Sequence, residues 1–372
     1  MWASSGAGFS LWGFVLARTK THRLKPAPLK PKDPIEHLFY KCTAISSGGE
    51  LKIVITDYRF PDVEQERRAV EAAGGTLVTG QAVTEQQVSD LCRDADGILT
   101  VRAPITRRAI SAMERCRIIV RYGIGVDTVD VEAATERGIL VANVPDYCLD
   151  EVSDHALALL LMLSRQMIPA IELAREDTWS VAKMPPLLRL RGQTCGLIGC
   201  GRIGSLLAGK VSALGMSVII HDPYLGEPRA REMGAELVLL DALLSRADFI
   251  SLHAPLNDTT HHLLGEAAFA KMKKTASIIN TARGGLIDEV ALLAALDAGK
   301  ISGAALDVLE SETAVTPMRS ALVRHPKMIV TAHTAWLSEK ARATLQLRAI
   351  EQVLACLRGE TPYGLINREL AK

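Results

Sequence analysis

A glycine-rich stretch over residues 193–204, QTCGLIGCGRIG, has the composition and spacing needed to bind the phosphates of a dinucleotide. Its glycines, Gly199, Gly201 and Gly204, follow the G-x-G-x-x-G pattern. Gly199 permits a tight turn, Gly201 lets the backbone approach a pyrophosphate, and Gly204 lets a helix pack closely on its strand. A helix that begins near Arg202 would point free N–H groups and the positive end of its dipole at the phosphates.

An acidic residue follows the glycine pattern at the distance expected of a ribose ligand. After a predicted helix over 203–214 and a predicted strand over 216–220, Asp222 stands 18 residues beyond Gly204, close to the usual spacing of about 20. Its carboxylate would accept hydrogen bonds from both ribose hydroxyls and repel a 2′-phosphate, which favours NAD over NADP. Two alternatives stay open. The glycines could form a plain turn, and Asp222 could merely cap a turn before Pro223.

Three further segments each place a chemically useful side chain after a predicted strand. NTARGGLIDE, over 280–289, puts Arg283 on the loop that precedes a helix. GAALDVLESE, over 303–312, is again a strand followed by an acidic loop, and IVTAHTAW, over 329–336, puts His333 just past a strand. Ligands of open parallel sheets bind at the C-terminal ends of the strands. An arginine, an acid and a histidine are therefore expected beside the dinucleotide.

The elements that must position these groups are two runs of alternating strands and helices. In the first run the predicted segments are 51–56, 62–73, 76–79, 85–92, 97–101, 106–113, 117–121, 128–137 and 139–142. Short apolar strands that alternate with helices indicate a parallel sheet covered on both faces. A second run of the same kind carries the glycine turn and extends to about residue 331.

Two helices are predicted outside these runs. A continuous helix over 150–175 contains HALALLLMLSRQM, which is too apolar for an exposed helix and is expected to be buried between domains or subunits. The last helix, over 337–357, has no strand of its own and is expected to pack back on the first domain. The sequence thus predicts an α/β fold of two Rossmann-like or flavodoxin-like parallel-sheet domains, with the NAD-binding domain inserted in the catalytic domain.

The predicted division of the chain has three parts. Residues 1–48 form an extension, 49–149 plus 333–372 form a discontinuous catalytic domain, and 150–332 form the NAD-binding domain. The extension has no acidic residue before Asp33, and its basic residues follow a short apolar run. A disordered extension is favoured, and an organellar targeting segment is the alternative.

Composition limits the partners. The 43 basic and 42 acidic residues leave a net charge of +1, which indicates neither nucleic acid nor an anionic membrane as a partner. None of the seven cysteines forms a C-x-x-C pair, so no disulfide framework and no metal site is predicted, and a reducing cytoplasm is expected. No apolar run reaches the ~18 residues of a membrane-spanning helix.

Taken together, these motifs resemble the D-isomer-specific 2-hydroxyacid dehydrogenases. RYGIGVD, GCGRIG, NTARGGLIDE, GAALDV and AHTAW occur in that order, and the match covers the chain from about Leu51 to its end. HDPYL, the HHLL after HAPLN, ALDVLESE and AHTAW are similar to the C-terminal-binding-protein branch, which includes dehydrogenase-like corepressors and bacterial enzymes. The resemblance implies NAD as cofactor, a small 2-oxo acid or 2-hydroxy acid as substrate, and a homodimer.

The resemblance also implies three catalytic residues. Arg283 would bind the substrate carboxylate and carbonyl oxygen, and His333 would exchange a proton with that oxygen. Glu312 would hydrogen-bond the other imidazole nitrogen and stabilise the imidazolium. Glu312 is preferred because it lies 29 residues after Arg283. Thr313 stands where the family usually has proline, and Glu310 stays open as an alternative partner.

The binding residues implied by the resemblance come from both domains. The cofactor set is Gly199, Gly201, Arg202, Ile203, Gly204, Asp222, His253, Ala254, Pro255, Thr281, Ala282, Arg283, Asp307 and His333. In this set Asp307 would hydrogen-bond the carboxamide, or would simply cap a loop. The substrate set is Arg102, Ala103, Arg121, Gly123, Ile124, Gly125 and Trp336. Backbone N–H groups of these first-domain loops would hold a carboxylate, Arg121 would add a cation, and Trp336 would line an apolar pocket or pack between domains.

Two functions from different classes follow from this reading. The first is an NAD-dependent reductase of small 2-oxo acids, of the hydroxypyruvate or glyoxylate type. The second is an NAD-sensing corepressor or scaffold. The sequence has no acidic or low-complexity tail after the helix predicted over 337–357, which favours the enzyme. A phosphoglycerate dehydrogenase with a regulatory domain is not expected, because the sequence stops soon after that helix.

Overall fold

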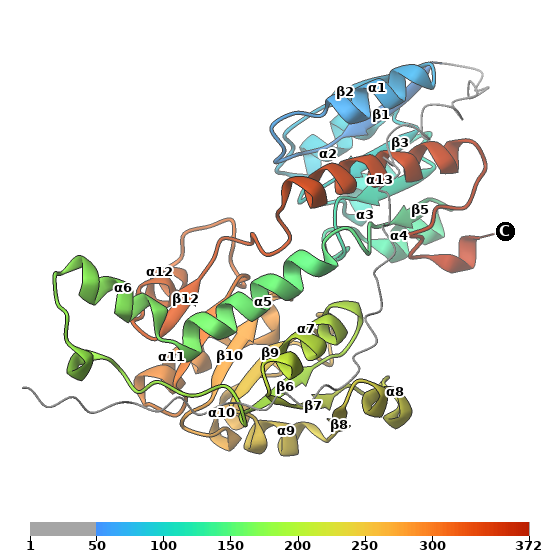
Figure 1. Cartoon of the computed structure of the whole chain (residues 1–372). Coiled ribbons are helices and arrows are strands. Elements are labelled where there is room, and N and C mark those ends of the chain that lie inside the picture. Colours follow the sequence, from blue (N-terminus) through green and yellow to red (C-terminus); the bar gives the residue numbers. More distant parts are fainter. Residues whose placement is uncertain (1–49, 372) are drawn as a thin grey trace, which may run out of the picture. The chain divides into compact units, whose positions relative to one another are not determined.

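Two parallel β-sheets, each covered by helices, make up residues 50–371, the part of the chain that this computed structural model describes (Figure 1). The predictions for residues 1–48 lie outside the described residues. Both sheets are parallel throughout, as the alternation of strands and helices predicted.

The smaller sheet has five strands in the order β2-β1-β3-β4-β5. Its strands are β1 (Leu51–Ile55), β2 (Gly75–Thr79), β3 (Gly97–Thr100), β4 (Ile118–Arg121) and β5 (Leu140–Ala142), and its helices are α1 (Glu64–Ala72), α2 (Glu85–Cys92), α3 (Arg107–Ser111) and α4 (Val131–Glu136). Ile53 belongs to the core on one face and Val54 to the core on the other, and both are fully buried. The strands consist mostly of apolar residues because both faces are covered.

The larger sheet has seven strands in the order β12-β11-β10-β9-β6-β7-β8. They are β6 (Thr194–Ile198), β7 (Ser217–His221), β8 (Ala235–Leu237), β9 (Phe249–Leu252), β10 (Ser277–Asn280), β11 (Gly303–Leu306) and β12 (Met328–Val330). The helices between them are α7 (Arg202–Ala213), α8 (Glu227–Glu232), α9 (Leu240–Arg246), α10 (Glu266–Lys271), α11 (Glu289–Asp297) and α12 (Pro317–Arg324). The strand order reverses between β6 and β9, which is where such sheets bind their ligands.

The helix predicted over 150–175 is wrong as one continuous element. It is two helices, α5 (Leu149–Ser164) and α6 (Met167–Arg175), whose axes meet at 61°. Gln166, between them, has a left-handed φ of 49°. The break has a local cause, because Pro169 would clash with a helical carbonyl four residues earlier, whereas proline is tolerated in the first turn of a new helix. The buried face of α5 packs on α7, β10 and β11.

The last long helix, α13 (Glu339–Leu357), returns to the smaller sheet as predicted and packs on β3, β4 and α1 (Figure 1). Its Val353 approaches so closely that a Cβ on Gly97 of β3 would lie 2.5 Å from Cγ1 of Val353. Beyond α13, Leu365 forms an antiparallel bridge with Ala142 at the end of β5. The smaller sheet is therefore completed by residues that follow the larger sheet in sequence.

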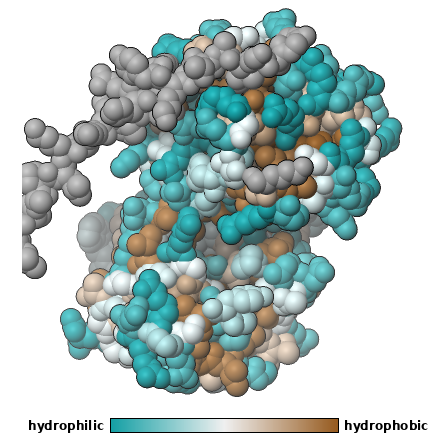
Figure 2. Space-filling view, turned by 90° about the vertical axis from the view of Figure 1, so that its right-hand side faces the viewer, coloured by the Kyte–Doolittle hydropathy of each residue, from teal (hydrophilic) through white to brown (hydrophobic). Residues whose placement is uncertain are grey.

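Three further features concern the surface, the cysteines and the length of the apolar helices. The face drawn in Figure 2 is largely hydrophilic with separate hydrophobic patches, as folded proteins generally are. The six cysteines within the described residues are free thiols. No single helix of residues 50–371 is long and apolar enough to cross a membrane. Only the bent pair α5–α6 passes that test, on length and composition alone.

The docking of the C-terminal segment depends on one buried glutamine, which generates a prediction. Gln352 is 1% exposed, donates from Nε2 to the carbonyl oxygen of Asn143 at 2.8 Å, and accepts from Gly364 N at 2.7 Å. Gln352→Leu leaves both backbone groups without a partner and is expected to lower the free energy of unfolding by about 2–4 kcal/mol, measured by urea denaturation. The exposed Gln81→Leu is the control, expected within about 0.5 kcal/mol of the parent. Equal effects would contradict the assigned role of Gln352.

Candidate functional site

The glycine turn lies at the reversal point of the larger sheet. Gly199 follows β6 with a φ of +84°, and a Cβ there would come within 2.7 Å of Ala254 N, in the loop after β9. A Cβ on Gly204 would lie 2.7 Å from the Gly199 carbonyl oxygen, so this glycine lets α7 pack on the turn. Gly201 is the N-cap of α7, no side chain caps the helix, and no atom lies within 4 Å of its would-be Cβ. The first N–H groups of α7 thus face open space suited to an anion.

Asp222 already holds the turn together. Its Oδ2 accepts a hydrogen bond from Cys200 N at 2.8 Å, and its Oδ1 accepts one from Tyr224 N at 2.8 Å. The turn-capping alternative is therefore present in the structure. Because each carboxylate oxygen can accept a second hydrogen bond, Asp222 is still able to bind a ribose from beside the glycine turn. That ribose contact stays a prediction.

A cavity of about 460 Å³ lies beside the turn and is lined by residues from both sheets. The predicted residues that line it are Arg121, Ile124, Gly125, Ile203, His253, Ala254, Pro255, Thr281, Ala282, Arg283, Asp307, His333 and Trp336. Gly199, Gly201, Arg202, Gly204, Asp222, Arg102, Ala103, Gly123 and Glu312 do not line it. The strand-end Arg283 and His333 therefore share one cavity.

The cavity wall contains a buried hydroxyl that lacks a partner. Thr281, at the end of β10, is 9% exposed, and its Oγ1 makes no hydrogen bond within residues 50–371. Buried polar groups are normally paired, so a ligand group in the cavity would satisfy this hydroxyl. Together with the uncapped α7 and the open space at Gly201, Thr281 makes the site fit a dinucleotide whose ribose or amide end enters the cavity.

Asp307 shapes the turn that carries His333. Its Oδ1 accepts from Thr334 N at 2.9 Å and from Thr331 Oγ1, and its Oδ2 accepts from Ala335 N at 2.9 Å. His333 has a left-handed φ of 56°, which is strained for a residue other than glycine. The loop-capping alternative for Asp307 is thus what the structure contains, and the carboxamide contact stays a prediction. Asp307 positions His333 by fixing the backbone around it.

Glu312, and not Glu310, contacts His333. The Nδ1 atom of His333 lies 2.9 and 2.8 Å from the two carboxylate oxygens of Glu312, and Arg102 Nη2 donates to Glu312 Oε2 at 2.6 Å. Burial acts to raise the pKa of Glu312, but the hydrogen bond from His333 and the charges of His333 and Arg102 outweigh it, and the pKa is lowered. The carboxylate therefore stays ionised and selects the tautomer with the proton on Nδ1.

Two guanidinium groups face the cavity over glycines. A Cβ on Gly125 would lie 1.6 Å from Nη2 of Arg283, and one on Gly123 would lie 1.7 Å from Nη1 of Arg121, so a larger residue at either position would displace these groups. Arg283 donates from Nε to Asp127 at 2.9 Å and from Nη1 to the Ala282 carbonyl, which leaves Nη2 without a partner in the described chain.

The electrostatics of this corner favour an anion. The guanidinium of Arg121 makes no hydrogen bond or ion pair with residues 50–371, and burial, together with the charges of Arg283 and Arg102, lowers the pKa of Arg121. A partly buried cation without a partner is costly, so a carboxylate in the cavity would be bound favourably.

The backbone N–H groups of Arg102 and Ala103, which were predicted to hold a substrate carboxylate, already have an acceptor within the protein, and their substrate role stays a prediction. These groups donate to a carboxylate of the protein, Asp57, at 2.8 and 3.2 Å, and Val101 N joins them at 2.9 Å. Asp57 is 8% exposed and follows β1. Sequence reasoning missed it, although its position after the first strand was a signal. Asp57 holds the loop from which the Arg102 side chain reaches Glu312.

Comparisons with known proteins agree with this geometry. Residues 157–335 match the family model "D-isomer specific 2-hydroxyacid dehydrogenase, NAD binding domain". A glyoxylate reductase of Korarchaeum cryptofilum is 35% identical over 293 residues, which is 78% of this chain and 88% of that protein. A D-3-phosphoglycerate dehydrogenase of Methanocaldococcus jannaschii is 39% identical over 85% of this chain, but the chain spans only 59% of that protein.

Solved structures give the same result. The structure of D-lactate dehydrogenase from Aquifex aeolicus, complexed with NAD and lactic acid, superposes with a TM-score of 0.77 at 28% identity. The match covers 83% of this chain and 96% of that one. A match of this extent shows that the fold of this chain as a whole resembles that of the solved structure.

The position of Asp222 generates a prediction about the cofactor. Asp222→Ala removes a charged acceptor worth about 1.5–3 kcal/mol, so the ratio of the NADPH to the NADH dissociation constant is expected to fall about tenfold or more in fluorescence titrations. Asp222→Asn keeps the shape and one acceptor oxygen for the turn, and should lower the ratio with a smaller loss of stability. An unchanged ratio in both variants would exclude Asp222 from the ribose site.

Proposed function

Because the chain belongs to the D-isomer-specific 2-hydroxyacid dehydrogenase family, we propose that it reduces a small 2-oxo acid, of the glyoxylate or hydroxypyruvate type, at the cavity between the two sheets. It is an NAD-dependent oxidoreductase that acts on the CH–OH group of its donor. The observation that carries the finer proposal is that Arg283 and His333 line one cavity, with Glu312 bonded to His333 Nδ1.

Arg283 binds the substrate in this proposal. Its free Nη2 faces the cavity over Gly125 and would donate to the carboxylate or the carbonyl oxygen of the 2-oxo acid. Arg121 adds a second positive charge, and Ile124 and Gly125 line the same cavity, where their N–H groups would be further donors. The donors concentrate where a carboxylate would lie, which orients the substrate for reaction.

His333 handles the proton. With Nδ1 directed at Glu312, the other ring nitrogen, Nε2, is the one left to give a proton to the carbonyl oxygen, which becomes the hydroxyl group. Glu312 stays ionised and stabilises the imidazolium before the transfer, and Arg102 positions Glu312. NADH, when bound, supplies the hydride to the carbonyl carbon.

The walls of the cavity favour a small substrate. Tyr147 and Trp336 meet with their ring centroids 6.0 Å apart at a tilt of 58°. Together with Ile124 and Ile203, they pack against a small buried cluster made of Cys148, Val152, Ala335 and Ala341. These side chains would exclude water from the reacting carbon and contact a short substrate side chain. The assignment of Trp336 to the substrate pocket is part of this proposal.

The corepressor alternative is not favoured, because the relatives described above carry the names of a reductase and of dehydrogenases. Placement in the C-terminal-binding-protein branch stays a prediction. We also keep the predicted division into 49–149 plus 333–372 and 150–332 as a proposal, supported by the return of α13 to the smaller sheet.

A homodimer and a cytoplasmic location complete the proposal. Met167 and Ile171 on α6 are 41% and 38% exposed, next to the largely apolar α5, and apolar side chains of this kind suit a subunit contact. The free thiols of the described chain suit a reducing compartment.

The proposed activity is tested by NADH oxidation with a panel of 2-oxo acids that includes glyoxylate, hydroxypyruvate and pyruvate. At least one substrate should be reduced by the parent protein at a rate about 10²-fold or more above that of Arg283→Ala, because the substrate carboxylate loses its charged anchor. Rates no higher than those of Arg283→Ala on every substrate would defeat the proposal.

The role of His333 gives a second prediction for the same assay. His333→Gln should lower turnover by about 10²-fold or more, the usual scale for a lost general acid, while the NADH dissociation constant changes little. His325→Gln is the matched control, since His325 also pairs with a carboxylate, that of Asp297, away from the cavity. An equal loss of NADH binding in His333→Gln would show a cofactor-binding role instead.

A further inference from the structure

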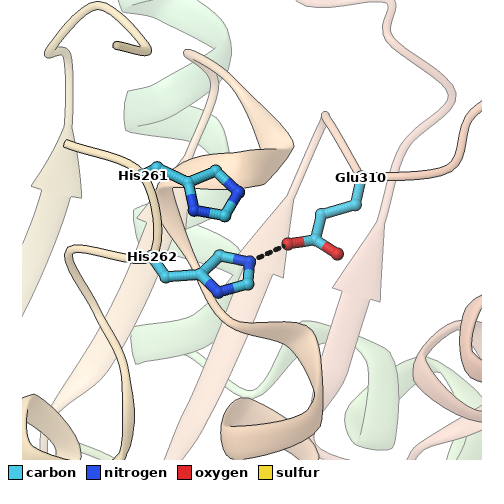
Figure 3. Close-up of side chains that lie close together, drawn as sticks. All are labelled: His261, His262 and Glu310. Atoms are coloured by element: carbon cyan, nitrogen blue, oxygen red, sulfur yellow. Dashed lines mark hydrogen bonds and ion pairs between the residues drawn. The ribbon is translucent and has the colours of Figure 1, made fainter. Parts of the chain in front are cut away.

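Three side chains outside the cavity gather on two neighbouring loops. His261 and His262 lie between β9 and α10, and Glu310 lies just after β11 (Figure 3). His262 Nε2 is hydrogen-bonded to Glu310 Oε1, and the two imidazole rings stack with centroids 3.9 Å apart at 22°. One ligand atom from each residue lies within 4.8 Å of the others. None of the three lines the cavity.

We propose that His261, His262 and Glu310 bind a divalent transition-metal ion of the zinc class. Two imidazole nitrogens and one carboxylate oxygen are a donor set that zinc uses in proteins, and a fourth position is then filled by water or an external ligand. Magnesium and calcium prefer oxygen donors, so the two histidines select against them. The ion would take the place of the hydrogen bond between His262 Nε2 and Glu310, with His262 bound as the neutral imidazole and Glu310 as the carboxylate.

The backbone holds the three ligands in place without the ion. His262 has a left-handed φ of 51°, and its N–H donates to the Gly285 carbonyl at 2.7 Å. Glu310 N donates to the buried carboxylate of Glu289 at 2.8 Å. Such strain in a residue other than glycine persists only when its surroundings impose it, and strained residues concentrate at functional sites. Here the strain directs the His262 ring at Glu310 (Figure 3).

The site is open to solvent yet anchored to the loop of Arg283. The side chains of His262 and Glu310 are 38% and 37% exposed, so an ion can enter from solution. A Cβ on Gly284 would lie 2.1 Å from the backbone of Leu309, and a Cβ on Gly285 would lie 3.6 Å from the His261 ring. A bound ion would therefore join the loop after β9 to the loop that leads to Glu312, with the Arg283 loop packed between them.

Zinc binding at these three residues is independent of the reductase activity proposed above, so the experiment measures binding of the ion itself. The full chain is titrated with ZnCl₂ by isothermal calorimetry in buffer free of chelators, with MgCl₂ as the comparison ion. One zinc ion per chain at this site is expected, with no competing uptake of magnesium. Bound zinc should also raise the thermal midpoint, because the ion binds only the folded arrangement of the loops.

Variants decide whether the ion lies at this site. His261→Ala and Glu310→Gln should each weaken zinc binding by about tenfold or more, since even partners that only support a ligand change affinity by about 10–100-fold. Both variants replace exposed side chains, and circular dichroism checks that they fold. His325→Ala, which removes a histidine that pairs with Asp297 outside this cluster, should bind zinc as the parent does. Binding that is absent in the parent, or equal in the parent and both variants, overturns the proposal.

Discussion

The carboxylate of Asp307 is the interaction on which the site depends. It accepts hydrogen bonds from two consecutive backbone N–H groups, at Thr334 and Ala335, and from the Thr331 hydroxyl. This cradle keeps His333 in a left-handed conformation that the free chain would rarely adopt. Only with the backbone fixed in this way does the His333 ring meet Glu312 on one side and the cavity on the other. A buried carboxylate with several hydrogen bonds thus fixes the backbone that carries the His333 imidazole.

The arginines around the cavity differ in how far their charges are paired within the protein. Arg283 is half-satisfied by Asp127, Arg102 is paired with Glu312, and Arg121 makes no ion pair with residues 50–371. The guanidinium groups of Arg121 and Arg283 lie against Gly123 and Gly125, which have no side chain to displace them. The rings of Tyr147 and Trp336 form the adjoining wall of the cavity. An incoming carboxylate would complete this balance, and the 2-hydroxy acids that give the family its name carry such a group.

Most features that the sequence predicts correctly come from local patterns. Strands and helices of both sheets, the turn at Gly199 and the proximity of Arg283 to His333 all follow from short segments whose period or strand-end position is visible in the chain. Asp57 could not be predicted in its role, because the three backbone N–H groups that its carboxylate holds lie 44–46 residues further along the chain. The break at Gln166 was missed although Pro169 stood in the sequence. The prediction gave more weight to the apolar run than to the proline. In the structure the helix breaks at Gln166, just before Pro169.

The return of α13 to the smaller sheet has a consequence for synthesis on the ribosome. β1 to β5 are made first, yet one of their two cores contains Leu345, Ile350 and Val353 from α13, which are made after the whole larger sheet. The nascent smaller sheet therefore cannot cover that face until α13 has been synthesised. All strands of the larger sheet are available before α13, so the larger sheet can complete its core first, whereas domains generally fold in order from the N-terminus.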